Sequence, residues 1–306
     1  MACRRKQIVV VLVFMLFGTR LFAQTAPCFQ QSVSVNILMQ DTISPELRAG
    51  ELAAKLDREH VKILSVLPGD PPHRVIVLLD SSGSVLSSSF AWRAYLAMAR
   101  NLVTNLPEGT TATLVVFANL IDMIIPVTDD RAKLESQFKT LEAGWGYFRK
   151  PRASALWDAM KAASDMYGEP RQGDVLYVLS DGGDNTSHIR FKDVETTFQS
   201  KPIKLQLISV RVRAPLRAEA EALQKLKNLA METGGATAEI SGKVKFQSLF
   251  RAVPRPYRME IEVPPRLKNT EKSTVTVTGA TIEGTDVKYS GRLASCSGTT
   301  TGNEVH

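Results

Sequence analysis

The residues best suited to chemistry are three oxygen-bearing side chains that directly follow an apolar run at 75–79: Asp80, Ser82 and Ser84. Because they occupy alternate positions, they can converge on one point if the loop curls, and the glycine at position 83 permits that curl. Oxygen donors of this kind suit a hard divalent cation such as Mg²⁺, Mn²⁺ or Ca²⁺. The same residues also suit a solvated turn that caps the next helix, so this run alone leaves both interpretations open.

Two further loops carry oxygen ligands. The run Ser-Asp-Gly-Gly-Asp-Asn at 180–185 directly follows a second apolar run, at 175–179, and contains Asp181. Open α/β sheets bind ligands at the carboxyl ends of their strands, so Asp80 and Asp181 are expected at the same edge of the sheet. A third loop brings Ser154 to the start of a predicted helix, and the three loops together predict a metal site at this edge. Asp184 and Asn185 belong to the same loop and are expected to cap the turn.

The elements that must hold these loops alternate between apolar runs and helix-length segments. Buried strands are predicted at 75–79, 114–117, 175–179, 205–210 and 236–240. Helices are predicted at 88–105, 130–142, 153–168, 190–199 and 216–233, with a last one near 243–252. This alternation indicates an α/β fold, a doubly wound and mainly parallel Rossmann-like sheet. The run 121–127 follows its predecessor after a very short gap and is predicted to be an antiparallel edge strand.

Two shorter regions flank this predicted domain at 74–253. The N-terminal region, 24–73, is predicted to contain a strand at 32–39, a helix at 45–60 capped by Ser44, a strand at 61–67 and a Pro/Gly-rich linker at 68–72. The C-terminal region, 254–296, is predicted to be a β-rich extension with strands at 257–263, 274–278 and 287–292. A flexible Ser/Thr/Gly-rich tail at 297–306 is expected to follow.

The sequence resembles the von Willebrand factor A domain with its metal-ion-dependent adhesion site. That motif reads Asp-x-Ser-x-Ser, then a threonine ahead of a helix, then an aspartate in a Ser-Asp-Gly turn. Asp80, Ser82 and Ser84 match its first part, and Asp181 matches its last. Ser154 stands where the family has threonine, which keeps the hydroxyl and loses a methyl group. The resemblance covers the predicted domain, and the regions around it are similar to secreted bacterial proteins related to this family.

The resemblance implies a role for each of these residues. Ser82, Ser84 and Ser154 would donate hydroxyl oxygens directly to the cation, while Asp80 and Asp181 would act mainly through bound water. Because few charged groups would bind the cation directly in this arrangement, the cation would stay electrophilic. Mg²⁺ is the metal expected first, with Mn²⁺ or Ca²⁺ as alternatives, and it usually keeps some of its waters. One open position could then accept a carboxylate from a partner protein.

The loop that leads into the serine at 154 is rich in aromatic and basic residues, namely Trp145, Tyr147, Phe148, Arg149, Lys150 and Arg152. Beside a metal ion, these side chains would suit an interface with an acidic partner. In the alternative interpretation, the aromatic rings pack onto the sheet and the charges are solvated.

The first 23 residues have the pattern of a secretory leader. Arg4, Arg5 and Lys6 precede an apolar run at 8–17, and Ala23 offers a small residue for cleavage. This run is short of the roughly 20 residues that span a bilayer, although an uncleaved membrane anchor is the alternative. We therefore expect an exported protein, periplasmic or secreted, with no membrane insertion after cleavage.

The composition fits a soluble globular protein and excludes several classes. The chain has 306 residues, of which 44% are apolar and 23% charged. Four cations of the leader contribute to the net charge of +7, and the remaining +3 is too mild and scattered for nucleic acid binding. Cys28 and Cys296 remain after cleavage and either form a disulfide or stay as two thiols. The sequence contains no Cys/His cluster of the kind that holds structural zinc.

Three functions are compared on this basis. The leading interpretation is a binding module, not an enzyme, that uses a divalent cation to grip an acidic group of another protein. A metal-dependent phosphatase or hydrolase would also place an aspartate after the first strand, but its pattern has a second aspartate where this chain has Ser82. The chain has no Gly-x-Ser-x-Gly elbow or phosphate-cradling glycine loop. The third interpretation is a structural domain with a vestigial site, for which the serine at 154 is the main support.

Overall fold

The computed structural model describes the chain from residue 30 to residue 294, with gaps. The described residues are 30–40, 47–143, 153–211, 216–241, 245–264, 273–279, 282, 285 and 287–294. The predicted leader, both mature cysteines, the tail at 297–306 and the aromatic and basic loop at 144–152 lie outside these ranges. Within the described residues, no helix is long and apolar enough to cross a membrane.

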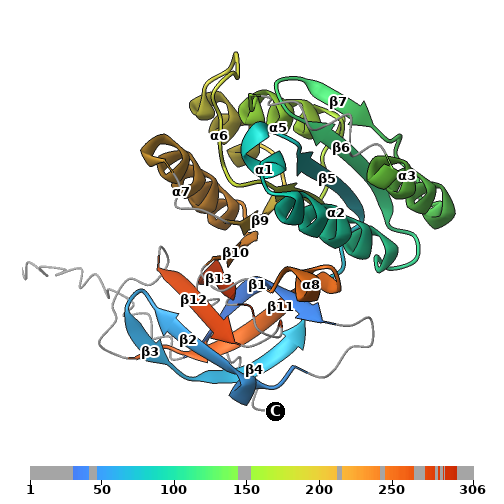
Figure 1. Ribbon diagram of the computed structural model, residues 1–306. Coiled ribbons are helices and arrows are strands. Elements are labelled where there is room, and N and C mark those ends of the chain that lie inside the picture. The colour runs from blue at the N-terminus through green and yellow to red at the C-terminus, as the bar shows by residue number, and fades with distance from the viewer. Residues whose placement is uncertain are drawn as a thin grey trace, which may run out of the picture. The chain divides into compact units, whose positions relative to one another are not determined.

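A parallel sheet forms the centre of the fold (Figure 1). Its strands are β5 (Arg74–Asp80), β6 (Thr111–Phe117), β8 (Asp174–Leu179), β9 (Ile203–Val210) and β10 (Ala236–Ile240), in the spatial order β10-β9-β8-β5-β6. On the far side of β6, β7 (Ile121–Ile124) runs antiparallel and forms an edge. The doubly wound sheet and the antiparallel edge strand predicted from the sequence are confirmed.

Helices cover both faces of this sheet because its strands are apolar on both sides. Val75, Val77 and Leu79 of β5 belong to one core cluster, and Ile76 and Leu78 belong to the other. The first face carries α2 (Ser89–Thr104) and α3 (Arg131–Ala143), after the short α1 (Gly83–Leu86). The second face carries α5 (Leu156–Asp165), α6 (Phe191–Gln199) and α7 (Arg217–Glu232).

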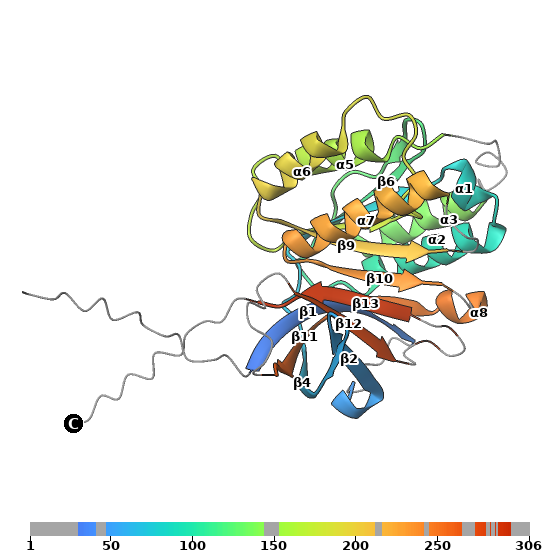
Figure 2. The same ribbon diagram turned by 90° about the vertical axis from the view of Figure 1, so that its left-hand side faces the viewer.

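The two flanking regions, expected as separate parts of the chain, pair with each other and with the central sheet. A second sheet joins β1 (Gln30–Gln40), β11 (Ala252–Glu262) and β4 (Ile63–Pro68), in the order β1-β11-β4. The strand β13 (Val287–Arg292) pairs antiparallel with β10, and β12 (Thr274–Gly279) pairs with β13. Figure 2 shows β13 and β12 continuing the sheet beyond β10. The central sheet is therefore extended at the edge opposite β7.

The prediction of a helix at 45–60 is wrong. The described part of this segment contains a single 3₁₀ turn, η1 (Ala49–Glu51), followed by a hairpin of β2 (Leu52–Leu56) and β3 (Glu59–Val61). In β2 the burial alternates, with three apolar side chains facing the core and two exposed. The leucine spacing suited a helix, but pairing of β2 with β12, which comes more than 200 residues later, decides the conformation.

The other departures from the predicted elements are smaller. The strand predicted at 61–67 is divided between β3 and β4, and the strand predicted from 257 begins at Ala252. The helix predicted near 243–252 is reduced to α8 (Phe246–Leu249), because β11 takes over the residues that follow.

The contact between β13 and β1 gives a test of how the two flanking regions are joined. A methyl group added to Gly291 of β13 would lie 2.2 Å from the carbonyl oxygen of Ser34 on β1. We expect Gly291→Ala to lower the free energy of unfolding by about 3 kcal/mol, because β1 must move away. Urea unfolding measures the change. The neighbouring Ser290→Ala is the control and should cost less than about 0.5 kcal/mol. Equal stabilities of the two variants would contradict this packing.

Candidate functional site

The aspartate at the end of β5 is the centre of the candidate site. Asp80 is completely buried, and its two carboxylate oxygens accept different hydrogen bonds. The backbone N–H of Ser82 donates to Oδ1 at 2.8 Å, and the hydroxyl of Ser180 donates to Oδ2 at 2.6 Å. Leu79 and Leu179 are paired in the ladder between β5 and β8, so the residues that follow them lie side by side. The strands therefore bring the first and last parts of the sequence motif together.

The loop after β8 is shaped by a glycine that no other residue could replace without strain. Gly182 has a φ of +89°, and a Cβ at this position would lie 2.9 Å from Cβ of Leu223. Its N–H donates to the Ser180 hydroxyl at 3.0 Å, and the N–H of Gly183 donates to Oδ1 of Asp181 at 3.2 Å. These contacts hold the Asp181 carboxylate, which is half-buried, at the carboxyl edge of the sheet.

Hydrogen bonds tie the third loop to the end of β6 and to the loop after β8. The N–H of Ala155 donates to the carbonyl of Ala118, just beyond β6, at 2.8 Å. The N–H of Asn185 donates to the carbonyl of Ser154 at 2.9 Å, and the Ser154 N–H donates to the Asn185 side chain at 2.8 Å. Ser154 is 3% exposed, and its hydroxyl oxygen has no hydrogen-bond partner. A buried hydroxyl without a partner is costly, so this oxygen is available to a ligand.

The two remaining predicted ligands lie at the start of α1. Ser82 is buried and Ser84 is half-buried, and their hydroxyl oxygens are 3.1 Å apart. Ser81, between Asp80 and Ser82, points elsewhere, since its hydroxyl donates to the carbonyl of Phe117 at 2.8 Å. The hydroxyls of Ser82 and Ser84 therefore lie in the candidate site, whereas the hydroxyl of Ser81 binds the backbone of the sheet.

The charges at this edge are poorly compensated by the protein itself. The pKa of the Asp80 carboxyl is raised to about 7, because burial and, to a smaller extent, the negative charge of Asp181 raise it more than the hydrogen bonds from Ser180 and Ser82 lower it. Both raising effects would be relieved by a bound cation. The carboxylates of Asp80 and Asp181, the hydroxyls of Ser82 and Ser84 and the unpaired Ser154 oxygen are all hard oxygen donors, so the residues fit a divalent cation.

The polar residues next to this donor set fix the start of α5. The backbone N–H of Trp157 donates to Asp184 at 3.3 Å and to the hydroxyl of Ser187 at 3.0 Å. Asp158 accepts from the backbone N–H groups of His188 and Ile189 at 3.0 and 3.1 Å. Asp184 therefore accepts a hydrogen bond from the start of α5, and Asn185 accepts one from the N–H of Ser154. Their expected role as caps of the turn stays a prediction.

One residue of the site was not predicted from the sequence. Ser180 holds the Asp80 carboxylate, and its place directly before Asp181 in a Ser-Asp-Gly turn was the available signal. A cluster of three or more His, Cys, Asp or Glu side chains that could hold a metal does not occur within the described residues.

Apolar side chains are exposed around this edge. Phe90 at the start of α2 is 50% exposed, Leu120 and Ile121 at the turn between β6 and β7 are 67% and 37% exposed, and Leu216 before α7 is 67% exposed. All four lie at the carboxyl edge of the sheet, because α2 and α7 begin there and β6 ends there. We call these four residues the apolar rim. The predicted partner-binding loop from Trp145 to Arg152 lies outside the described residues.

A match to a known domain family agrees with this fold and motif. Residues 75–183 match the family model of the von Willebrand factor type A domain. This span begins in β5 and ends in the Ser-Asp-Gly turn, so it contains every predicted metal ligand. The chain therefore carries a von Willebrand factor type A domain, as its sequence motif predicted.

Three solved structures are similar to this chain. The conserved hypothetical protein BatB from Bacteroides thetaiotaomicron is 18% identical, with a TM-score of 0.41, over 55% of this chain and 90% of that chain. A von Willebrand factor type A protein from Catenulispora acidiphila is 13% identical, with a TM-score of 0.39, over 86% and 74%. An aerotolerance-related membrane protein from Bacteroides fragilis is 15% identical, with a TM-score of 0.41, over 57% and 94%. None of the curated proteins matches the sequence.

Proposed function

We propose that this chain is an exported protein-binding module that holds a divalent cation and uses it to engage an acidic group of a partner protein. The ligands would be Asp80, Ser82, Ser84, Ser154 and Asp181, with Mg²⁺ as the first metal and Mn²⁺ or Ca²⁺ as alternatives. The observation that carries the proposal is the Ser154 hydroxyl, which is buried without a hydrogen-bond partner at the same edge as the buried Asp80 carboxylate.

The protein residues would bind and orient the cation, which supplies an electrophilic site for a carboxylate. Three serine hydroxyls are neutral donors and leave most of the charge of the ion uncompensated. The Asp80 carboxylate already accepts hydrogen bonds at both oxygens, so it is suited to hold bound water and to balance charge. A partner carboxylate would then complete the coordination.

The apolar rim supports a protein as the partner. An ion site that bound only small molecules would not require large apolar side chains around it, whereas protein interfaces combine apolar contacts with a few polar anchors. The partner would therefore present an aspartate or glutamate among apolar side chains. Von Willebrand factor A domains are generally interaction modules without enzymatic activity, which also favours binding over a phosphatase or hydrolase.

Export is proposed from the sequence of the leader alone. The basic residues at 4–6 and the apolar run at 8–17 are the features that support it. The metal-binding domain would then work in a compartment where free millimolar divalent cations are available to a site with few direct charges.

Metal-induced stabilisation tests the cation site. With Mg²⁺ at about 100 times its Kd, the folded protein should gain on the order of 2–3 kcal/mol, which raises Tm by roughly 5–10 °C. The double variant Asp80→Ala, Asp181→Ala should show no such shift, whereas Asp129→Ala, which changes an exposed acid elsewhere, should respond like the wild type. An equal shift in all three proteins would place the bound ion elsewhere. No shift in any of them at millimolar Mg²⁺ or Mn²⁺ would favour the vestigial site.

A further inference from the structure

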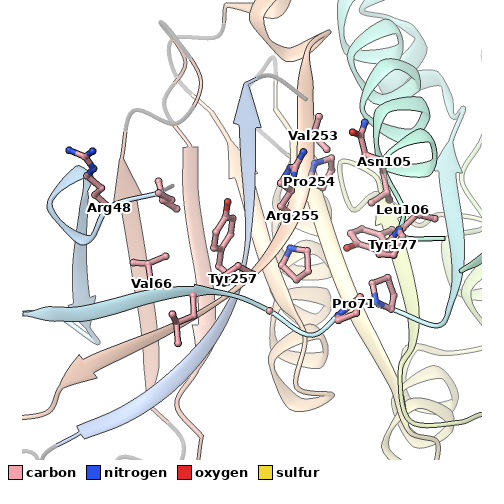
Figure 3. Close-up of a pocket in the computed structure, with 18 residues that line it drawn as sticks. Arg48, Val66, Pro71, Asn105, Leu106, Tyr177, Val253, Pro254, Arg255 and Tyr257 are labelled. Atoms are coloured by element: carbon pink, nitrogen blue, oxygen red, sulfur yellow. The ribbon is translucent and has the colours of Figure 1, made fainter. Parts of the chain in front are cut away.

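A pocket of about 600 Å³ lies at the opposite end of α2 from the candidate metal site. One wall is formed by Leu102 in the last turn of α2 and by Leu106 just beyond that helix, together with Tyr177 of β8. The other wall is formed by β4 at Val66 and Leu67 and by β11 from Val253 to Tyr257. Figure 3 shows Tyr177 and Leu106 on one side, with Arg255 and Tyr257 facing them from β11.

Hydrogen bonds between these walls hold the pocket open. The side chain of Asn101 on α2 donates to the carbonyls of Phe250 and Ala252 at 3.1 and 3.0 Å, which ties α2 to the start of β11. At the other end, the N–H of Gly69 donates to the carbonyl of Pro256 at 2.9 Å. A Cβ on Gly69 would lie 3.0 Å from Cβ of Pro256, so a larger residue here would push the linker and β11 slightly apart. Asn101 therefore connects the two walls of the pocket, and Gly69 connects the linker to β11 at the other end.

The lining is rigid and mainly apolar. Six of the lining residues are prolines, three of them in the segment 68–72. Proline has no backbone N–H to offer a ligand and no flexible side chain that could fill the space. Leu67 is 42% exposed and is one of the few large apolar side chains exposed within the described residues. A volume in the range 300–1,000 Å³ with such a lining is typical of small-molecule sites.

The charged residues of the lining all have the same sign. The charged residues of the lining are Arg48 and Arg255. The described residues that line the pocket include no Asp or Glu. Burial raises the pKa of the Tyr257 phenol, and the positive charge of Arg255 opposes this, so the guanidinium and the phenol are close. Arginine forms charge-assisted hydrogen bonds to carboxylates, and a phenol O–H can add another. The pocket thus combines a mainly apolar lining with two positively charged residues.

We propose that this pocket binds a free amphiphile with an apolar body and a single anionic headgroup, such as a medium-chain carboxylic acid. The apolar part would lie against Leu67, Leu106 and the prolines. The headgroup would lie beside Arg255 and Tyr257, and Arg48, on the other side of Tyr257 (Figure 3), would add to the positive charge of the pocket. This site would be separate from the metal site, and it does not depend on metal binding.

Calorimetric titration of the full chain with decanoate tests the proposal, with decanol as the uncharged probe. We expect one-to-one saturable binding of decanoate, with decanol about tenfold weaker or more. The double variant Arg48→Gln, Arg255→Gln should weaken decanoate by a similar factor and leave decanol unchanged. Leu67→Trp, which places an indole in the pocket, should abolish both. Matched controls are Arg217→Gln and Val127→Trp, which change exposed residues elsewhere and should bind like the wild type.

Thermal unfolding of each variant shows whether it folds, and only folded variants are compared. The absence of saturable decanoate binding to the wild type would overturn the proposal. Binding that decanol matches, or that Leu67→Trp does not alter, would also overturn it. The proposal would also be overturned if the protein did not bind decanoate but cosedimented with phosphatidylglycerol vesicles, because the occupant would then be a membrane surface.

Discussion

In metal-free buffer at pH 8, Asp80→Asn is expected to make the protein more stable than the wild type, by on the order of 1–4 kcal/mol. The wild-type carboxylate is completely buried, lies near the negative charge of Asp181 and has a pKa raised to about 7. Its ionised form is therefore unfavourable in the folded state. Asparagine has nearly the same shape, can still accept from the N–H of Ser82, and carries no charge.

The same pKa sets the pH dependence of the wild type. In the unfolded chain the carboxyl has its ordinary pKa near 3.8, so between about pH 4 and pH 7 the folded protein holds a proton that the unfolded chain has released. Stability without metal should therefore fall as the pH rises through this window, and should change little through this group above about pH 7. The Asp80→Asn protein should lack this fall.

Adding Mg²⁺ should reverse the order of stability of the two proteins at pH 8. The cation favours the ionised carboxylate, so the wild type gains stability and Asp80→Asn gains little. Urea unfolding at pH 5 and pH 8, with EDTA or with Mg²⁺, measures all of these differences. If Asp80→Asn is less stable than the wild type in EDTA at pH 8, the carboxylate is held by protein contacts alone and the account of this site is wrong.

Ser154→Ala is expected to lower the affinity for metal without lowering the stability of the metal-free protein. The hydroxyl has no hydrogen-bond partner, so its removal should change metal-free stability by less than about 0.5 kcal/mol. The affinity for Mg²⁺ or Mn²⁺ should fall by about 10–100-fold or more, since even indirect partners of metal ligands have effects of this size. Calorimetry measures the affinity, and urea unfolding in EDTA measures the stability.

Two further variants serve as controls for this prediction. Thr113 on β6 also has a buried hydroxyl without a partner, but it lies near the amino end of its strand. Thr113→Val should leave the metal affinity unchanged. Ser154→Thr, which restores the family residue, should bind metal at least as tightly as the wild type. Unchanged metal affinity in Ser154→Ala would remove this serine from the site and strengthen the vestigial interpretation.

The central domain could be predicted from the sequence because its signals are local. A strand buried on both faces must be apolar at every position, as Val75 to Leu79 is, and a polar residue directly after it must lie at the carboxyl edge of the sheet. This reasoning placed Asp80 and Asp181 at the same edge of the sheet. The structure adds that their strands are adjacent and that the hydrogen bond from Ser180 joins their loops. The position of Ser154 depended on the family motif, because no apolar run precedes it.

The flanking regions could not be predicted in the same way, because distant residues decide them. The segment Leu52–Leu56 has a leucine spacing that is compatible with a helix or a strand, and its partner β12 lies far along the chain. Likewise, nothing local to β1 indicates that it pairs with β11 along its whole length. The pocket next to β11 depends on this pairing, so its cationic and apolar lining could not be found by motif.

The location of bound Mn²⁺ in crystals tests the central claim most directly. Crystals soaked in millimolar Mn²⁺ with acetate, which supplies a carboxylate, should show an anomalous difference peak at the carboxyl edge of the sheet. We predict that this peak contacts the hydroxyl oxygens of Ser82, Ser84 and Ser154, and that an acetate oxygen shares the ion. A Mn²⁺ peak at another place, or no peak beside these serines, would contradict a cation-dependent binding site at the ends of β5 and β8.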